Sequence, residues 1–228
     1  MLVLWRHMSI VQRVAATTKN GMFRLMAVDD GAQTHFELYI NDMLHMATYF
    51  SDLAVQLAKA TLSGVTVRHA EILMGGLGLG LTLRHILDHE AVQSVCVVES
   101  QPRMVDWNRE YLGNADLLDD PRVELIVGDF YDYVQGTPRN YHGITVHIDE
   151  GPDQVVRVEN RRIYGLQMLQ VLQSRLRSGG ALAIRALQPT PSYERALKIH
   201  FDEVELLPVI DKNTTGEDQV CVVYQARA

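Results

Sequence analysis

Glycines and acidic residues gather in this sequence at places where strands are expected to end. The first such place is the apolar run at 72–75, which is followed by Gly76, Gly78 and Gly80 and then by a helical pattern. Glycines at a strand–helix junction allow a sharp turn and a close approach of the backbone to a ligand, while free N–H groups of the helix face the same point. The sequence therefore predicts a cofactor-binding turn that begins at Gly75.

The spacing of these glycines indicates the class of cofactor. They alternate with other residues, but the position at which a dinucleotide fingerprint has its third glycine is Leu81. This difference favours a nucleoside-type cofactor over NAD. Glu99 ends the next apolar run about 20 residues later, which is the interval at which an acid accepts hydrogen bonds from ribose hydroxyls. We therefore expect Glu99, with Ser100 beside it, to contact the cofactor.

Two later runs also end in acidic residues. Asp129 and Phe130 follow the third run. The Asp129 carboxylate either accepts a hydrogen bond from the amino group of an adenine, whose ring Phe130 would cover, or caps a helix. Asp149 and Glu150 follow the fourth run, and their loop is either solvated or positions an acceptor amine and removes its proton. Asp149 is thus the candidate catalytic residue, and Tyr49, Asp149 and Glu150 are the candidate substrate residues.

The segments that must position these residues alternate between strand and helix patterns from Val65 onward. This order predicts an α/β fold with a doubly wound, Rossmann-like parallel sheet that is covered by helices on both faces. The last two strands have only a polar turn over 212–218 between them and are therefore predicted to pair antiparallel. The strands are expected at 72–75, 95–99, 121–129, 143–149, 181–184, 204–210 and 220–224.

Helices are expected between these strands, because their apolar residues recur at helical spacing. Shorter helices are expected at 82–87, 102–112 and 193–200. A longer helix is expected to reach residue 178 and to be capped by Gly179 and Gly180. Its buried stripe would be formed by Val155, Val158, Leu166, Leu169, Leu172 and Leu176.

Residues 1–50 are predicted to form a small N-terminal β appendage, and residues 51–228 the cofactor-binding domain. Met22–Val28 and Phe36–Ile40 are the expected strands of the appendage, with a turn at 29–31 between them. Ser51 and Asp52 are the expected N-cap of a helix that ends before Gly64. Because such short strands cannot bury a core alone, the appendage is expected to cover the cofactor cleft.

The composition excludes several classes of function. A net charge of −7 and a pI near 5.7 argue against a basic surface for nucleic acid. Cys96 and Cys221 lie in apolar strand patterns, which is typical of a reducing cytoplasm. The apolar run at 1–5 is too short for a signal sequence, and no run has membrane length, so no membrane partner is expected. The expected partner is a small-molecule substrate, and a homodimer is the candidate assembly.

The motifs at the strand ends resemble the spermidine synthase-like branch of the class I S-adenosylmethionine-dependent methyltransferase superfamily. The resemblance runs from about residue 22 to the end of the chain. It implies a sheet of seven strands whose last two form the antiparallel hairpin, and S-adenosyl-L-methionine as the cofactor. It rests on the segments 75–84, 97–99, 107–109, 120–123 and 149–152, and on 38–42 in the appendage.

Three departures from this family bear on the reaction. In aminopropyltransferases an Asp of the glycine turn pairs with the amine of decarboxylated S-adenosylmethionine, and Leu79 stands in its place. The family also has a Tyr-His pair that lines the polyamine pocket, and the matching residues 54–55 are Ala and Val. The two-Asp gate motif of the family keeps its first Asp as Asp149, but the position of the second Asp is Pro152, and Asp153 follows one residue later. A polyamine site needs several carboxylates to offset the desolvation of the cation. The resemblance with these departures therefore predicts that the chain is not a spermidine synthase.

The function predicted from the sequence is a transferase that uses S-adenosylmethionine on a small molecule, with methyl transfer as the main interpretation. One alternative is attack on the carbon chain of the cofactor with release of methylthioadenosine, by aminopropyl transfer, aminocarboxypropyl transfer or cyclisation of the chain. Another is a non-catalytic module that binds the cofactor. No metal site is expected, and His147 is expected to be a hydrogen-bonded core residue.

Overall fold

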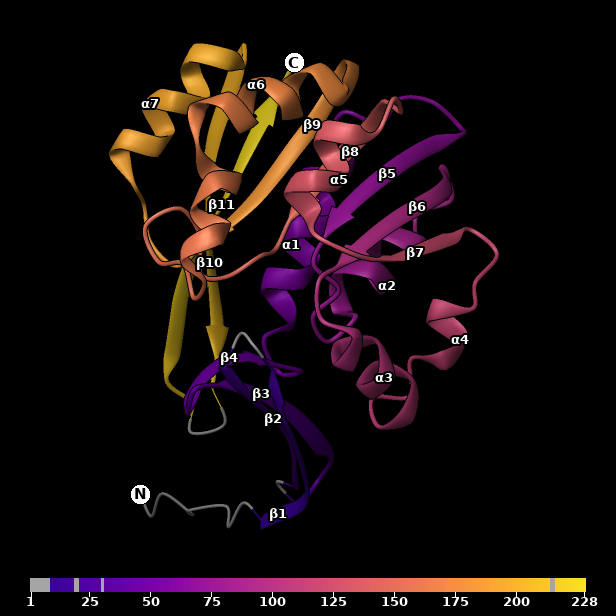
Figure 1. Cartoon of the computed structure of the whole chain (residues 1–228), viewed down its shortest axis with the longest axis vertical. Helices are drawn as coiled ribbons and strands as arrows, with labels where there is room; N and C mark the ends of the chain where they lie inside the picture. The colour runs from indigo at the N-terminus through magenta and orange to yellow at the C-terminus, as the bar shows by residue number, and fades with distance from the viewer. Residues whose placement is uncertain (1–8, 19–20, 30, 214–215) are drawn as a thin grey trace.

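The computed structural model of this chain describes residues 9–18, 21–29, 31–213 and 216–228. Residues 1–8 of the expected appendage, Asp30 of its expected turn, and Thr214 and Thr215 of the later polar turn lie outside the described residues. Figure 1 shows a large twisted sheet flanked by helices, with a smaller sheet packed at one end. Among the described residues, no helix has both the length and the apolar character needed to span a lipid bilayer.

The smaller sheet is an antiparallel meander in the order β1-β2-β3-β4. Its two central strands bury apolar side chains, among them Phe23, Leu25 and Leu38. These side chains pack on Leu79 and Trp107 of the larger sheet's loops and helices, so the small sheet shares a core with the rest of the chain. Its strands are β1 (Ser9–Thr18), β2 (Gly21–Asp29), β3 (Thr34–Ile40) and β4 (Met43–Ala47).

The larger sheet has seven strands in the order β10-β11-β9-β8-β5-β6-β7. Five of them are parallel, whereas β11 is antiparallel to both β9 and β10, as predicted for the final hairpin. The strand order reverses at β5, between β6 and β8, so the carboxyl ends of these strands form a switch point at which ligands bind in doubly wound sheets. The strands are β5 (Ala70–Gly75), β6 (Val92–Glu99), β7 (Val123–Val127), β8 (Tyr141–Val146), β9 (Leu176–Ala186), β10 (Glu203–Lys212) and β11 (Asp218–Arg227).

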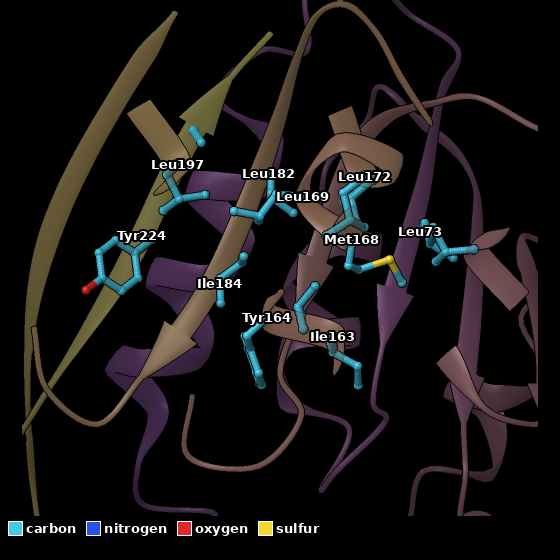
Figure 2. Close-up of a cluster of buried hydrophobic side chains, with 14 of the residues drawn as sticks. Leu73, Ile163, Tyr164, Met168, Leu169, Leu172, Leu182, Ile184, Leu197 and Tyr224 are labelled. Atoms are coloured by element: carbon cyan, nitrogen blue, oxygen red, sulfur yellow. The ribbon is translucent and has the colours of Figure 1, made fainter. Parts of the chain in front are cut away.

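Helices cover both faces of the larger sheet. On one face α5, the 3₁₀ helix η1, α6 and α7 pack against alternate strand residues such as Leu73 and Ile184, as Figure 2 shows. On the other face α1, α2 and α4 pack against the intervening residues, for example Ile72 and Val95. The helices are α1 (Ser51–Leu62), α2 (Leu81–Leu87), α3 (Pro102–Glu110), α4 (Ala115–Leu118), α5 (Phe130–Gly136), η1 (Val158–Tyr164), α6 (Leu166–Arg175) and α7 (Pro191–His200).

The predicted doubly wound α/β fold is confirmed, but the predicted long helix after the fourth strand is wrong. The strand ends at Val146, a loop that contains Asp149 follows, then η1, and α6 begins only after Gly165. Val158 and Leu166 are 76% and 57% exposed, so they do not belong to a buried stripe. Gly179 and Gly180 lie inside β9 and do not cap the helix, which ends four residues earlier.

The beginning of α1 also differs from the prediction. No side chain of the neighbouring residues caps this helix. The carboxylate of Asp211 on β10 instead accepts hydrogen bonds from the backbone N–H groups of Asp52 and Leu53, at 2.9 and 3.0 Å. This distant acid satisfies two of the helix's free N–H groups and ties α1 to the final hairpin.

Candidate active site

The candidate site is a cavity at the carboxyl ends of β5, β6 and β8. Side chains of the small sheet, including Phe23, Leu38, Ile40 and Met46, form one wall of it, so this sheet covers the cleft. Of the residues predicted to form the site, the cavity brings together Gly76, Gly78, Glu99, Ser100, Asp129, Phe130 and Asp149.

Two of the four predicted glycines line this cavity. Gly76 has a φ of +88°, and a Cβ there would lie 2.4 Å from the carbonyl oxygen of His147, so only glycine fits. Gly78 also has positive φ and lies against Met46. Gly75 and Gly80 lie outside the cavity and serve packing: their Cβ positions are filled by the Phe130 ring and by the side chain of Asn114.

The glycine turn is held from α3 and the segment after it. Asn108 Nδ2 donates a hydrogen bond of 2.8 Å to the carbonyl oxygen of Gly78, and Asn114 Nδ2 donates one of 3.0 Å to that of Leu79. Both Asn side chains are buried, and they are hydrogen-bonded to each other. The structure therefore adds two positioning residues that our sequence reasoning did not assign, although Asn108 lies in a motif of the family.

Glu99 is not a solvated strand end but a buried carboxylate, only 6% exposed. Its oxygens accept hydrogen bonds from the backbone N–H groups of Leu77, at 2.9 Å, and Gln101, at 2.7 Å. Burial raises the pKa of Glu99, and these N–H groups oppose the rise only in part. Because each carboxylate oxygen has a further lone pair, Glu99 can fix the glycine turn and still accept hydrogen bonds from a ligand.

Of the two roles that the sequence leaves open for Asp129, the structure shows the helix cap. It precedes α5, and its Oδ1 accepts the N–H of Asp132 at 3.2 Å, so it caps this helix. Its Oδ2 pairs with Arg162 at 2.9 Å. The residue still lines the cavity beside the buried ring of Phe130, an arrangement that can contact an aromatic base.

Asp149 lies three residues after the end of β8 with the left-handed φ of +52°, which an Asp tolerates better than most residues. Its Oδ2 accepts a hydrogen bond of 2.9 Å from Asn160 Nδ2 and a longer one from the Arg157 N–H. Burial raises the pKa of Asp149, although these hydrogen bonds oppose it. A half-buried carboxylate with a raised pKa, held at the wall of a cleft, is suited to accept a proton.

The structure does not bring the other two candidate substrate residues to this cavity. Tyr49 donates its hydroxyl to Glu37 at 2.8 Å and packs on His35 and Phe50, away from the cavity wall. Glu150 does not line this cavity: its carboxylate pairs with Arg185 and is 2.9 Å from His45 Nδ1. Burial alone would raise the pKa of Glu150, but the hydrogen bond with His45 and the Arg185 charge hold it below its usual value.

A second, smaller cavity adjoins the first, because Met46 and His147 line both. It lies between β4, the beginning of α1 and the glycine turn. The expectation that His147 is a hydrogen-bonded core residue is wrong: among the described residues its ring makes no hydrogen bond. Burial and the nearby Arg185 charge lower the pKa of His147 to about 3, so its imidazole is neutral at neutral pH.

The residues of the first cavity fit a nucleoside with a short chain. Gly76 lets the backbone come close to a ligand, Glu99 offers acceptor oxygens for hydroxyl groups, and Phe130 offers an apolar aromatic surface. A small sheet that closes over the cleft removes the ligand from water. This combination matches the chemistry of an adenosine-containing cofactor.

Comparison with known proteins identifies the family. The spermine/spermidine synthase domain matches residues 39–203, which is most of the chain. The chain belongs to this family. The matched region includes the glycine turn, Glu99, Asp129 and Asp149, so these residues of the first cavity lie in the part shared with the family, whereas Phe23 and Leu38 of its wall precede that part.

Curated relatives and solved structures agree with this assignment. Polyamine aminopropyltransferase 2 of Pseudomonas aeruginosa is 31% identical over 147 residues, which are 59% of this chain and 40% of the relative, and that of Hyperthermus butylicus is 28% identical over 124 residues. The matched region thus spans about two fifths of the length of these relatives. Spermidine synthase from Thermotoga maritima has the same fold, with a TM-score of 0.75 and 15% identity over 96% of this chain and 74% of that one. Human methyltransferase-like protein 13, in complex with SAH, is less similar, with a TM-score of 0.56 over 77% of this chain and 80% of its own.

Proposed function

We propose that this chain transfers a three-carbon chain of the aminopropyl type from an S-adenosyl sulfonium donor to a small amine and releases methylthioadenosine. The observation that supports this most directly is Asp149, a carboxylate with a raised pKa in the same cavity as Glu99 and the glycine turn. The similarity to polyamine aminopropyltransferases supports chain transfer over the methyl transfer that we favoured from the sequence.

Each residue of the cavity has a defined task in this proposal. When bound, the donor supplies an activated carbon: the amine forms a C–N bond as the C–S bond breaks, and the sulfur leaves with the electron pair. Gly76 and Glu99 bind and orient the nucleoside part, and Phe130 covers its base. Asp149 orients the acceptor amine and takes its proton, while Asn160 holds the carboxylate in place.

The identity of the released nucleoside tests this proposal. Purified protein is incubated with decarboxylated S-adenosylmethionine or with S-adenosylmethionine, each with and without an amine acceptor such as putrescine. Release of methylthioadenosine, accompanied by an acceptor of increased mass, is the expected result. Release of S-adenosylhomocysteine would support methyl transfer instead, and binding without either product would support the non-catalytic module.

Asp149→Asn tests the role of the carboxylate. Asparagine keeps an acceptor for Asn160 and tolerates the left-handed backbone, so the fold is expected to persist. Turnover is expected to fall about 10²- to 10⁴-fold, the usual contribution of a general base. Asp153→Asn is the matched control, because Asp153 lies in the same loop but bonds Thr190 outside the first cavity. Equal rates for both variants would contradict the proposed role of Asp149.

A further inference from the structure

The second cavity has a composition that sets it apart from a site for a cationic chain. Most of its wall is apolar, with Met46, Phe50, Leu53, Leu77 and Leu79 among its residues. Among the described residues that line it there is no Asp or Glu. Its polar wall consists of His45, His147 and Arg185, with Thr82 near the glycine turn. An ammonium group that entered this cavity would lose its hydration without meeting a carboxylate.

Arg185 is a buried cation whose donors are only partly used. The residue is 7% exposed and lies on β9, the strand next to β8. Its Nη1 bonds the carbonyl oxygen of Asp149 at 3.1 Å and pairs with Glu150. Its Nε is buried and has no hydrogen-bond partner among the described residues. A guanidinium that lines a cavity and keeps an unused N–H offers a bond to an incoming oxygen acceptor.

Glu150 is the carboxylate that pairs with Arg185, and it is also 2.9 Å from His45 Nδ1. It is not among the residues that line either cavity. Its ion pair therefore orients the guanidinium, while no described residue of the second cavity's wall carries a negative charge. His147 stands between the two cavities, so a chain that extends from the first cavity into the second passes its neutral ring.

We propose that the second cavity binds the carboxylate of a substrate chain through Arg185. This inference rests on the proposed function and specifies its substrate class. The carboxylate comes either from the donor, when S-adenosylmethionine itself is used and a 3-amino-3-carboxypropyl group is transferred, or from an amino acid that serves as the acceptor amine. In both cases the C–N bond forms, the C–S bond breaks, methylthioadenosine leaves with the electron pair, and the amine proton passes to Asp149.

Calorimetry with three nucleosides tests the donor as the source. Methylthioadenosine probes the first cavity alone, and decarboxylated S-adenosylmethionine differs from S-adenosylmethionine only by the carboxylate. If the donor supplies the carboxylate, S-adenosylmethionine is expected to bind at least tenfold more tightly than the decarboxylated compound. Arg185→Gln is expected to remove this preference and to change the affinity for methylthioadenosine less than twofold.

Turnover with paired acceptors tests the other source. With decarboxylated S-adenosylmethionine as donor, 4-aminobutyrate and butylamine differ by a carboxylate at matched amine chemistry. If the acceptor supplies the carboxylate, the KM for 4-aminobutyrate is expected to be at least tenfold lower, and Arg185→Gln is expected to remove the difference. Arg177→Gln, which changes an exposed Arg on the same strand, is the control that leaves both preferences intact.

The outcomes separate the two proposals. Because Arg185→Gln leaves Glu150 without its ion pair, the double variant Arg185→Gln/Glu150→Gln removes both charges and is measured beside it. Methylthioadenosine binding without any carboxylate preference in either arm overturns the inference while the proposed function stands. Failure of the wild-type protein to bind methylthioadenosine overturns both.

Discussion

Replacing Glu99 by glutamine perturbs the point at which the glycine turn meets the cofactor cavity. The carboxylate accepts one backbone N–H on each oxygen, from Leu77 and Gln101. A glutamine of the same size has only one acceptor oxygen, so its amide NH₂ must face the other N–H. A buried N–H that loses its partner costs about 1–3 kcal/mol, and we expect the free energy of unfolding to fall by that amount.

The same substitution is expected to weaken the binding of the proposed nucleoside ligand. The carboxylate oxygen that becomes an NH₂ group can no longer accept a hydrogen bond from a ligand hydroxyl, and the loss of this acceptor, at ~1–3 kcal/mol, corresponds to about 5- to 150-fold in Kd. Urea unfolding and calorimetry with methylthioadenosine measure the two effects. Glu124→Gln is the matched control, because this exposed Glu on β7 takes part only in a surface ion pair worth less than ~1 kcal/mol. If Glu99→Gln behaves like this control in both assays, the assigned role of Glu99 is wrong.

Three further predictions concern the base, the turn and the small sheet. Because burial raises the pKa of Asp149, turnover is expected to fall as the pH drops through that pKa, and Asp149→Asn should remove this acidic limb from the pH–rate profile. Gly76→Ala is expected to lower the free energy of unfolding in urea more than Gly113→Ala does. Both glycines have positive φ, but only a Cβ at Gly76 would meet atoms within 4 Å, of which the His147 carbonyl oxygen is the nearest. Equal losses of stability in the two variants would show that this contact with the His147 carbonyl oxygen is unimportant. Removing residues 1–50 is expected to abolish turnover, and a truncated chain that remains folded and fully active would disprove the covering role of the small sheet.

Much of the fold could be predicted because each strand of the large sheet is a short apolar run followed by a turn. Strand pairing and the final hairpin follow from that order. The helix after β8 could not be placed, because Val158 and Leu166 have helical spacing but face solvent. Helical spacing of apolar residues predicts a helix correctly only when those residues are buried. In addition, α6 begins after Gly165, and the spacing of the apolar residues does not indicate this boundary.

The site was predictable where it depends on backbone and strand ends, and not where it depends on partners far apart in the chain. Gly76, Glu99 and Asp149 meet at one cavity because parallel strands place their carboxyl ends together. Glu150, in contrast, is withdrawn by His45, which lies 105 residues earlier. No local pattern indicates that pairing, so the sequence alone assigned Glu150 to the substrate.

In our two proposals, chain transfer and substrate choice depend on different parts of this molecule. The first cavity would supply the carboxylate that takes the amine proton and the glycines that admit the nucleoside, and these requirements are the same for every acceptor. The second cavity would set the charge that the substrate chain meets. With Leu79 at its wall and Glu150 paired with Arg185, a dication in that space would lose its hydration, at several kcal/mol for each charge, without gaining a carboxylate partner from the wall. A chain that ends in a carboxylate would instead accept a hydrogen bond from the unused N–H of Arg185. The loss for the dication and the gain for the carboxylate both favour binding of the chain that ends in a carboxylate.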